Sequence, residues 1–397
     1  MKIAIYTGTF KENQDGATKT LYRWTDFLLT QGHQVGVWAF SVTPQKKSGL
    51  QIFTLPSVPL PMYKDYRIAF PTLSLRNQLR RFRPDAIHVT VPDLVGKELL
   101  RLARDMKIPA VTSFHTDFPS YLESYKLGAL EDLSWKYLGW FYNQSLAVYA
   151  PTDEMKFKLT LNGVENVRLW RRGISPDEFS PHFRDLGIRG QWDAEGKIVI
   201  LFSGRFVWYK DLQTFVEVYR LFNRRAPGKA RFVLAGDGPV RRELEEMMPD
   251  ARFTGYLKGE DLSRVYASSD MLLFPSTTET FGNVVQEAVA SGIPAVVSNV
   301  GGCQEIVNRS GAGLVAQAKD AESFFNSCRC LMDNPRLARA MKQHGLLYAR
   351  EQSWDRINLQ LADDFEAIIA QHKAPAGANA AALRPARRLM MRLGFND

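Results

Sequence analysis

Residues 196–238 read GKIVILFSGRFVWYKDLQTFVEVYRLFNRRAPGKARFVLAGDG, and this stretch decides the fold class. The apolar run IVILFS is typical of a buried strand and stops at Gly204. The segment DLQTFVEVYRLFNRR carries apolar residues at helical spacing, and ARFVLA is a second buried strand that stops at Gly236. A strand, a helix and another strand in this order predict a parallel sheet that helices cover.

The same alternation fills the rest of the chain. The strand KIAIYT is followed by the helix TKTLYRWTDFLLTQG, in which Leu21, Trp24 and Leu28 share one face and Gly32 is the expected end. Because the pattern restarts at Gly196, we expect an α/β protein with two doubly wound, Rossmann-like domains facing a central cleft. The expected ranges are a first domain at 1–185, a second domain at 186–350, a C-terminal helix at 351–372 and a basic tail at 373–397. One alternative for the C-terminal helix is that it crosses back to the first domain.

Composition narrows the class of protein. Apolar residues make up 45% of the 397 residues, yet no run of 18 apolar residues occurs, so no membrane-spanning helix is expected. The N-terminus MKIAIYTGTF lacks the pattern of a signal peptide. The chain has three cysteines, and none of them forms a CxxC pair, which favours reduced structural thiols. We therefore expect a cytoplasmic protein, with a peripheral place on the inner face of the membrane as the alternative.

The formal net charge of +9 is unevenly distributed. Residues 1–185 hold 24 Lys and Arg against 18 Asp and Glu, residues 186–372 hold 22 against 23, and the tail holds 5 against 1. A basic first half and a basic tail suit an anionic partner, either a phosphorylated substrate or an acidic membrane surface. Nucleic acid is disfavoured because the chain has no zinc-finger spacing and no RNP-type aromatic motif.

Glycines and cations follow several strands, where parallel sheets bind their ligands. Gly204 and Arg205 end one strand and Lys210 comes five residues later, so two cations are placed to hold a diphosphate. Helices that follow Gly16 and Gly282 offer free backbone N–H groups, which are anion sites.

Two carboxylates stand in an otherwise small and apolar stretch, PSTTETFGNVVQEAVASGIPAVV at residues 275–297. Glu279 and Glu287 have seven residues between them. A helix beginning near Thr280 would place Thr280, Asn283 and Glu287 on one face. This arrangement favours holding sugar or ribose hydroxyls, while acid–base hydrolysis by the two carboxylates stays an open alternative.

Together these motifs resemble a known family. The segments ETFGNVVQEAVASGIPAVVS, SGRFVWYKD, VLAGDGP and GGCQEIV are similar to the second domain of the retaining glycosyltransferases of family 4, which have the GT-B fold. SFHTDFPSYLESY and LWRRGISPDEFSP resemble the subgroup of sulfolipid synthases and lipid mannosyltransferases. The chain departs from the subgroup at two places: it has Arg172-Gly173-Ile174-Ser175 where R-G-V-D is usual, and Gln14-Asp15-Gly16-Ala17 where Asn-Gly-Val is common.

The resemblance implies roles for matching residues. Arg205 and Lys210 would neutralise the leaving diphosphate, and Glu287 would bind the ribose. Glu279 and the amides of Phe281 and Gly282 would hold the sugar, and His115 would contact the sugar and the acceptor side. The implied catalytic set is Arg205, Lys210, His115 and Glu279; the donor-binding set is Gly16, Gly204, Gly236, Gly238, Phe281, Gly282, Asn283 and Glu287; the acceptor-side set is Asp117 and Arg172.

The expected activity is retaining transfer of a hexosyl group from a nucleoside diphosphate sugar, the co-substrate, to a membrane lipid or glycan acceptor. Lys258 stands where some guanine-binding relatives carry an acid, which favours a UDP-sugar. A GDP-mannose-dependent α-mannosyltransferase with a soluble or polysaccharide acceptor is the alternative, and a nucleotide-sugar 2-epimerase is the alternative from another class. No D-x-D motif occurs, so neither a metal nor another cofactor is expected. The aromatic stretch SWKYLGWFYNQ and the tail RRLMMRLGF suggest reversible contact with an anionic membrane.

Overall fold

The computed structural model describes residues 1–11, 16–43, 47–60, 63–117, 119 and 131–374. Its contacts divide the chain into two compact units, each described by itself below. The first unit comprises Met1–Ser113, Trp140–Val148 and Asn358–Asp397, and the second comprises Phe114–Gly139 and Tyr149–Ile357. The domain ranges expected from the sequence stay a prediction.

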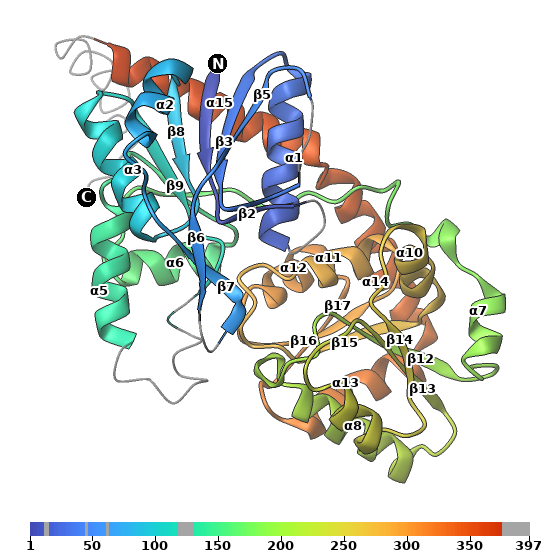
Figure 1. Cartoon of the computed structure of the whole chain (residues 1–397). Helices are drawn as coiled ribbons and strands as arrows, with labels where there is room; N and C mark the ends of the chain where they lie inside the picture. The colour runs from blue at the N-terminus through green and yellow to red at the C-terminus, as the bar shows by residue number, and fades with distance from the viewer. Residues whose placement is uncertain (12–15, 44–46, 61–62, 118, 120–130, 375–397) are drawn as a thin grey trace, which may run out of the picture. The chain divides into compact units, whose positions relative to one another are not determined.

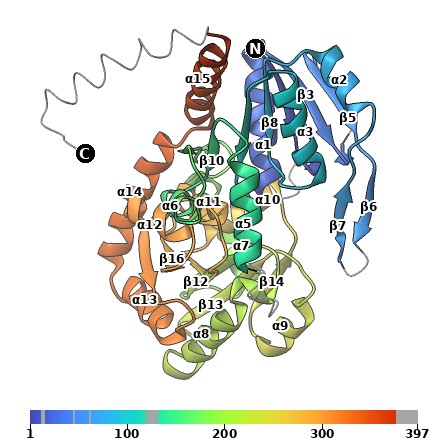
Figure 2. The same cartoon turned by 90° about the vertical axis from the view of Figure 1, so that its left-hand side faces the viewer.

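The strands of the first half form one large sheet and two small ones. The large sheet has the order β11-β10-β9-β8-β1-β3-β5, and β1 pairs in parallel with both β3 and β8. The antiparallel hairpin of β6 and β7 forms a sheet of its own (Figure 2). The strands are β1 (Lys2–Tyr6), β2 (Thr9–Phe10), β3 (Gln34–Ala39), β4 (Ser41–Val42), β5 (Leu50–Thr54), β6 (Ser57–Leu60), β7 (Tyr63–Ala69), β8 (Ala86–Val89), β9 (Ala110–Ser113), β10 (Val148–Ala150) and β11 (Val167–Leu169).

Helices connect these strands as the sequence predicted. Leu21, Trp24 and Leu28 are at most 2% exposed on helix α1, and Gly32 follows its end with a φ of +77°. The helices of this part are α1 (Gly16–Thr30), α2 (Leu75–Phe82), α3 (Leu94–Asp105), α5 (Glu131–Tyr142) and α6 (Asp153–Leu161).

A six-stranded parallel sheet organises the second unit, with the order β14-β13-β12-β15-β16-β17. Helices α8 and α13 lie on one side of it, and α10, α11 and α12 on the other (Figure 1). The strands are β12 (Ile198–Ser203), β13 (Ala230–Ala235), β14 (Arg252–Gly255), β15 (Met271–Phe274), β16 (Ala295–Ser298) and β17 (Gly313–Ala316). The helices are α7 (Leu186–Gln191), α8 (Leu212–Arg225), α9 (Arg241–Met247), α10 (Gly259–Ser268), α11 (Asn283–Ala290), α12 (Cys303–Ser310), α13 (Ala321–Asp333) and α14 (Pro335–Glu351), with short 3₁₀ turns η2 (Pro181–Phe183) and η3 (Trp208–Lys210).

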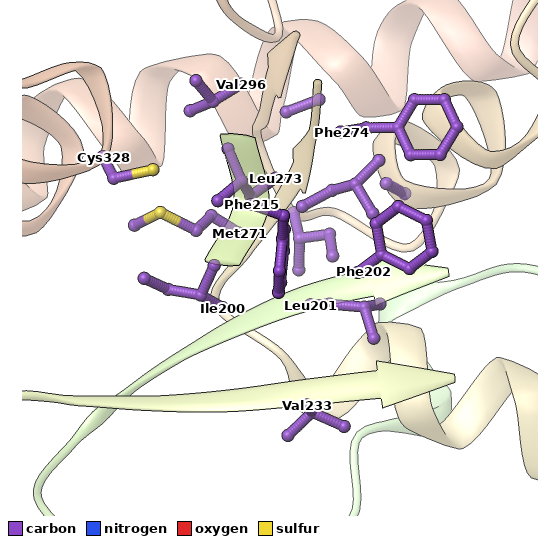
Figure 3. Close-up of a cluster of buried hydrophobic side chains, with 14 of the residues drawn as sticks. Ile200, Leu201, Phe202, Phe215, Val233, Met271, Leu273, Phe274, Val296 and Cys328 are labelled. Carbon is purple, nitrogen blue, oxygen red and sulfur yellow. The ribbon is translucent and has the colours of Figure 1, made fainter. Parts of the chain in front are cut away.

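The core of the second unit is apolar and closely packed around its central strands. Figure 3 shows side chains of β12, β13, β15 and β16 meeting Phe215 of α8 and Cys328 of α13. The Phe202 ring lies 5.5 Å from the rings of both Phe215 and Phe274, centroid to centroid. This core fixes the ends of β12 and β15, from which the candidate site is built.

Helix α15 (Trp354–Lys373) belongs to the first unit from Asn358 onward. There the Asn358 amide donates to the Arg23 carbonyl, and the Phe365 ring lies 5.5 Å from both Trp24 and His88. His88 is fully buried on β8 and is hydrogen-bonded to Ser113, so its place is structural.

Two expectations from the sequence are changed by the structure or fall outside it. Helix α11 begins at Asn283 and not near Thr280, so the proposed face of Thr280, Asn283 and Glu287 does not exist on one helix. Most of the basic tail, from residue 375, lies outside the described residues. Among the described helices none is long and apolar enough to cross a membrane.

Candidate functional site

The site is built around an ion pair between two loops of the second unit. Lys210 ends the turn η3 after β12, and Glu279 lies in the loop after β15, so the order of the sheet brings them together. The Lys210 Nζ donates to Glu279 Oε1, and both side chains stay partly exposed, at 16% and 22%. Burial acts to lower the pKa of Lys210, but the Glu279 charge outweighs it and raises that pKa above 10.5. Lys210 is therefore a fixed cation at the strand ends.

The loop that carries Glu279 is held at several points. Asp211, with a φ of +55°, accepts hydrogen bonds from the Thr277 N–H at 3.0 Å and the Thr277 hydroxyl at 2.7 Å. The Gly302 N–H donates to the Glu279 carbonyl at 2.7 Å. These bonds order the backbone that presents Glu279, and Asp211 is a residue that sequence reasoning missed.

Helix α11 begins directly after this loop and has no side-chain cap. Its cap residue Gly282 has a φ of +97°, and a Cβ there would lie 2.5 Å from Cys303 Sγ. Phe281, beside it, is buried, and Asn283 opens the helix half-buried. The uncapped first turn leaves backbone N–H groups of the kind that bind anions. Burial, followed by the charge of Glu279, raises the pKa of Cys303 well above 9.0, so this thiol is not ionised.

The glycines at the ends of β12 and β13 have a packing reason. Gly204 and Gly236 have φ values of +144° and +143°, which disfavour other residues. A Cβ on Gly236 would lie 1.9 Å from the Gly204 carbonyl oxygen, and one on Gly238 would lie 2.2 Å from the Phe206 carbonyl oxygen. The loops after β12 and β13 therefore touch through their backbones, and Arg205, between Gly204 and Phe206 in the first of these loops, is exposed.

Glu287 lies on α11 and is linked through Tyr266 to Ser203, the last residue of β12. The buried Tyr266 hydroxyl donates to Glu287 Oε2 at 3.0 Å. Burial, reinforced by the Glu287 charge and opposed by a hydrogen bond with Ser203, raises the pKa of Tyr266 well above 10.0. Tyr266 therefore stays a neutral donor that orients the Glu287 carboxylate.

His115, which follows β9, belongs to the same unit as the loop of Glu279. The Thr280 hydroxyl donates to the His115 carbonyl at 3.0 Å. The Arg172 Nη2 lies 3.0 Å from His115 Nδ1, and Trp170 stacks edge-on against the imidazole at 5.8 Å. His115 and Glu279 are thus joined through one intervening residue, Thr280.

Asp117 lies two residues beyond His115 and is buried. It accepts a hydrogen bond from Lys158 of α6 at 2.6 Å, and the Lys158 Nζ lies 5.4 Å from the centre of the Trp135 ring. Asp117 is therefore engaged by a cation of its own unit. No spacing in the sequence pointed to Lys158 as its partner.

Gly16 begins α1 in the first unit, where its carbonyl accepts from the Thr20 hydroxyl. Because it lies in the other unit, its relation to the residues above stays a prediction. Within the described residues no group of three or more His, Cys, Asp or Glu side chains gathers at a metal-binding distance.

Comparison with known proteins identifies the family. Residues 197–334 match the family model described as glycosyl transferases group 1, and residues 14–178 match the model described as glycosyltransferase family 4. The chain is 30% identical over 379 residues to a GDP-mannose-dependent alpha-mannosyltransferase of Corynebacterium glutamicum, covering 93% of this chain and 90% of the relative. The chain is a family 4 glycosyltransferase.

Other relatives of this family 4 glycosyltransferase have different names. It is 30% identical to the sulfoquinovosyl transferase SQD2 of Arabidopsis thaliana, over 73% of this chain and 58% of the relative. It is 25% identical to an alpha-monoglucosyldiacylglycerol synthase of Streptococcus pneumoniae, over 75% and 70%. These names agree with the subgroup that its first half resembles.

The fold agrees with the family as well. Sucrose-phosphate synthase from Thermosynechococcus elongatus superimposes with a TM-score of 0.76 at 19% identity, covering 93% of this chain and 99% of that one. Such low identity carries the fold alone. The enzyme therefore has the GT-B fold of two Rossmann-like halves that its sequence predicted.

Proposed function

We propose that this family 4 glycosyltransferase moves a hexosyl group from a nucleoside diphosphate sugar to a membrane lipid or lipid-linked acceptor, with retention at the anomeric carbon and without a metal ion. The observation that carries the proposal is the ion pair of Lys210 and Glu279 beside the uncapped start of α11. A cation, free N–H groups and a carboxylate in one place suit a substrate that has a diphosphate at one end and hydroxyls at the other.

The mechanism follows from where charge develops. As the bond from the sugar to the diphosphate breaks, negative charge grows on the diphosphate, and the positive groups Arg205, Lys210 and the N-terminus of α11 stabilise it. Glu279 holds hydroxyls of the transferred sugar. The leaving phosphate accepts the proton of the acceptor hydroxyl, so no protein nucleophile is needed.

Glu287 is proposed to hold the ribose of the donor, since its carboxylate is oriented by Tyr266. The test compares a donor with its 2′-deoxyribose analogue. We expect the deoxy donor to have a KM about 10-fold higher than the normal donor in the native enzyme, and the two to be equal in Glu287→Ala, which has no acceptor for the ribose hydroxyl, because a lost hydrogen bond is worth about 1.5 kcal/mol. Equal KM values in the native enzyme would refute this role.

The base of the donor has two candidates. A UDP-sugar is favoured by Lys258, an exposed cation at the start of α10, since some guanine-binding members of the family that the sequence resembles carry an acidic residue there. GDP-mannose is favoured by the name of the Corynebacterium relative. Purified enzyme with UDP- and GDP-hexoses, membrane lipid extract and glycan acceptors, read by mass spectrometry, separates the two.

The same assay tests the remaining parts of the proposal. Retention is read from the anomeric coupling constant of the product, and full activity in excess chelator is the expected result for a metal-independent enzyme. An epimerised nucleotide sugar formed without any acceptor would replace this proposal with the 2-epimerase.

A membrane surface is the proposed source of the acceptor. On α5, Leu133, Tyr137 and Trp140 are 64%, 39% and 47% exposed at helical spacing, and Lys97 lies 5.4 Å above the Trp140 ring. Aromatic and apolar side chains beside lysine suit the interface of an anionic bilayer. Leu133→Gln combined with Trp140→Gln should reduce flotation with phosphatidylglycerol vesicles, whereas Leu347→Gln, 59% exposed on α14, should not.

A further inference from the structure

Two adjacent arginines precede Gly173 and have opposite surroundings. Arg171 forms ion pairs with Asp153 at 2.6 Å and with Glu305 at 3.3 Å. Arg172 is only 5% exposed, and no carboxylate of the described residues forms an ion pair with it. A buried cation normally has an acidic partner, so the position of Arg172 calls for another explanation.

The contacts of Arg172 are to neutral groups. Its Nη1 donates to the Trp170 carbonyl at 2.9 Å, and its guanidinium carbon lies 4.9 Å from the centre of the Trp170 ring. Burial lowers the pKa of Arg172 to about 9, so the side chain is still charged near neutral pH. Its carbonyl accepts from Gln286 Nε2 of α11 at 3.0 Å, which ties the segment to the helix that carries Glu287.

The remaining contact, from Arg172 Nη2 to His115 Nδ1 at 3.0 Å, constrains the histidine. A guanidinium has only donors, so Nδ1 must accept with its lone pair. A neutral imidazole whose Nδ1 is an acceptor carries its proton on Nε2. Protonation of Nδ1 would remove that acceptor and bring a second cation against Arg172.

We propose that Arg172 is a positioning residue that holds His115 as the neutral Nε2–H tautomer, so that this ring donates a hydrogen bond from Nε2 and does not accept a proton during transfer. That His115 donates to a hydroxyl of the sugar or the acceptor rests on the proposed function. The tautomer itself rests only on the contact with Arg172.

Other charged groups near His115 are already engaged. Asp117, two residues along the chain, accepts from Lys158, and Glu279, one residue from Thr280, accepts from Lys210. Trp170, which packs against the imidazole edge, is uncharged. Arg172 contacts the imidazole ring itself, at Nδ1, so its removal should change the histidine.

Long-range ¹H–¹⁵N NMR of the full chain tests the tautomer, because the chain has only six histidines. His115→Gln assigns the signals. In the native protein we expect the Nε2–H pattern, unchanged between about pH 5 and pH 8. In Arg172→Met we expect a mixture of tautomers and a ring that titrates near the ordinary histidine value of about 6.5.

The matched control is Arg171→Met, which removes a neighbouring cation but no contact with His115, and it should leave the His115 signals as they are. Arg172→Lys keeps a charged donor and should retain part of the native pattern; it also serves if Arg172→Met does not fold. An Nδ1–H pattern in the native protein, or an unchanged pattern in folded Arg172→Met, would overturn the proposal.

A kinetic measurement tests the consequence for transfer. Arg172→Met should lower kcat about 10-fold or more, with a new dependence on pH near 6.5, while native enzyme shows none there. A loss of kcat with no new pH dependence would assign Arg172 a purely structural role. If no donor in the panel is turned over, the proposed function fails, but the NMR result still decides on the tautomer.

Discussion

Both units place a polar pair at the carboxyl ends of parallel strands, but the two pairs differ in kind. In the first unit the Tyr6 hydroxyl, at the end of β1, donates to Asp93 at 2.5 Å, and Tyr6 is fully buried. In the second unit Lys210 pairs with Glu279, and both remain partly exposed. Burial raises the pKa of both Tyr6 and Asp93, whereas Glu279 raises that of Lys210 against the effect of burial.

This difference separates a structural pair from one that can bind a ligand. Asp93 also accepts the Gly96 N–H and so caps α3, which leaves the pair of Tyr6 and Asp93 satisfied within the fold. The Lys210 ammonium has three N–H donors. It can therefore donate to a phosphate oxygen while it keeps its hydrogen bond to Glu279. The comparison therefore predicts that substitution of Lys210 lowers activity and that substitution of Tyr6 lowers stability.

The largest effect is expected for Lys210→Met. Loss of the fixed cation should lower kcat/KM about 10²–10³-fold, since this is the scale for losing a group that stabilises developing negative charge. The control is Lys229→Met, at an exposed position of the same unit. Steady-state kinetics with the preferred donor measures kcat/KM for both variants. Equal values of kcat/KM for Lys210→Met and Lys229→Met would contradict the predicted role of the Lys210–Glu279 pair.

Gly238→Ala tests the backbone contact beneath the site. Its new Cβ would lie 2.2 Å from the Phe206 carbonyl oxygen, so the loops after β12 and β13 must separate. We expect a loss of about 1–3 kcal/mol in the free energy of unfolding, with reduced activity. Gly190→Ala, whose nearest neighbour is 3.9 Å away, should not destabilise the enzyme. Equal denaturant midpoints for the two variants would contradict the expectation.

Tyr6→Phe tests the first unit. Removal of the hydroxyl leaves the Asp93 carboxylate with one donor fewer, and we expect a loss of about 1–2 kcal/mol in unfolding free energy with kcat changed less than about 2-fold. Chemical denaturation and kinetics on the same sample provide both values. A large fall in kcat at unchanged stability would mean that this pair too acts on substrate.

The smallest effect on stability is expected at the ion pair between Asp85 and Lys373 of α15, both in the first unit. Asp85 accepts from Lys373 Nζ and the Lys2 N–H, both at 2.9 Å; burial acts to raise its pKa, but these bonds lower it below 3.8. Asp85→Asn should cost less than about 1 kcal/mol because Lys373 is exposed. The lowered pKa means that this stabilisation is present above pH 3.8 and is lost as the pH falls through the folded-state pKa.

Denaturation of the native protein and of Asp85→Asn across that pH range measures the difference. A double-mutant cycle with Lys373→Met isolates the ion pair. A stability difference that grows at low pH would have the wrong sign and would contradict the assignment.

The sequence by itself determined the strands, the helices between them and the residues that follow the strands. Short apolar runs such as IVILFS that stop at glycine are typical of buried strands, and their alternation with amphipathic helices leaves few topologies, so β12, α8 and β13 lie where the pattern placed them. Residues in the loops that follow strands, such as Arg205 and Glu279, are predicted by the same reasoning. The start of α11 did not, because Gly282 with its positive φ caps the helix three residues later than the spacing suggested.

Only the tertiary structure decided which side chains meet. His115 and Arg172 are 57 residues apart, Asp211 and Thr277 are 66 apart, and Tyr266 and Glu287 are 21 apart. The first two pairs form between loops that follow different strands, and the third joins helices α10 and α11. Strand order, which brings these elements together, is not written in local periodicity. The physical reason is that periodicity reports which face of an element is buried, whereas a hydrogen bond between two loops depends on how the whole sheet is assembled.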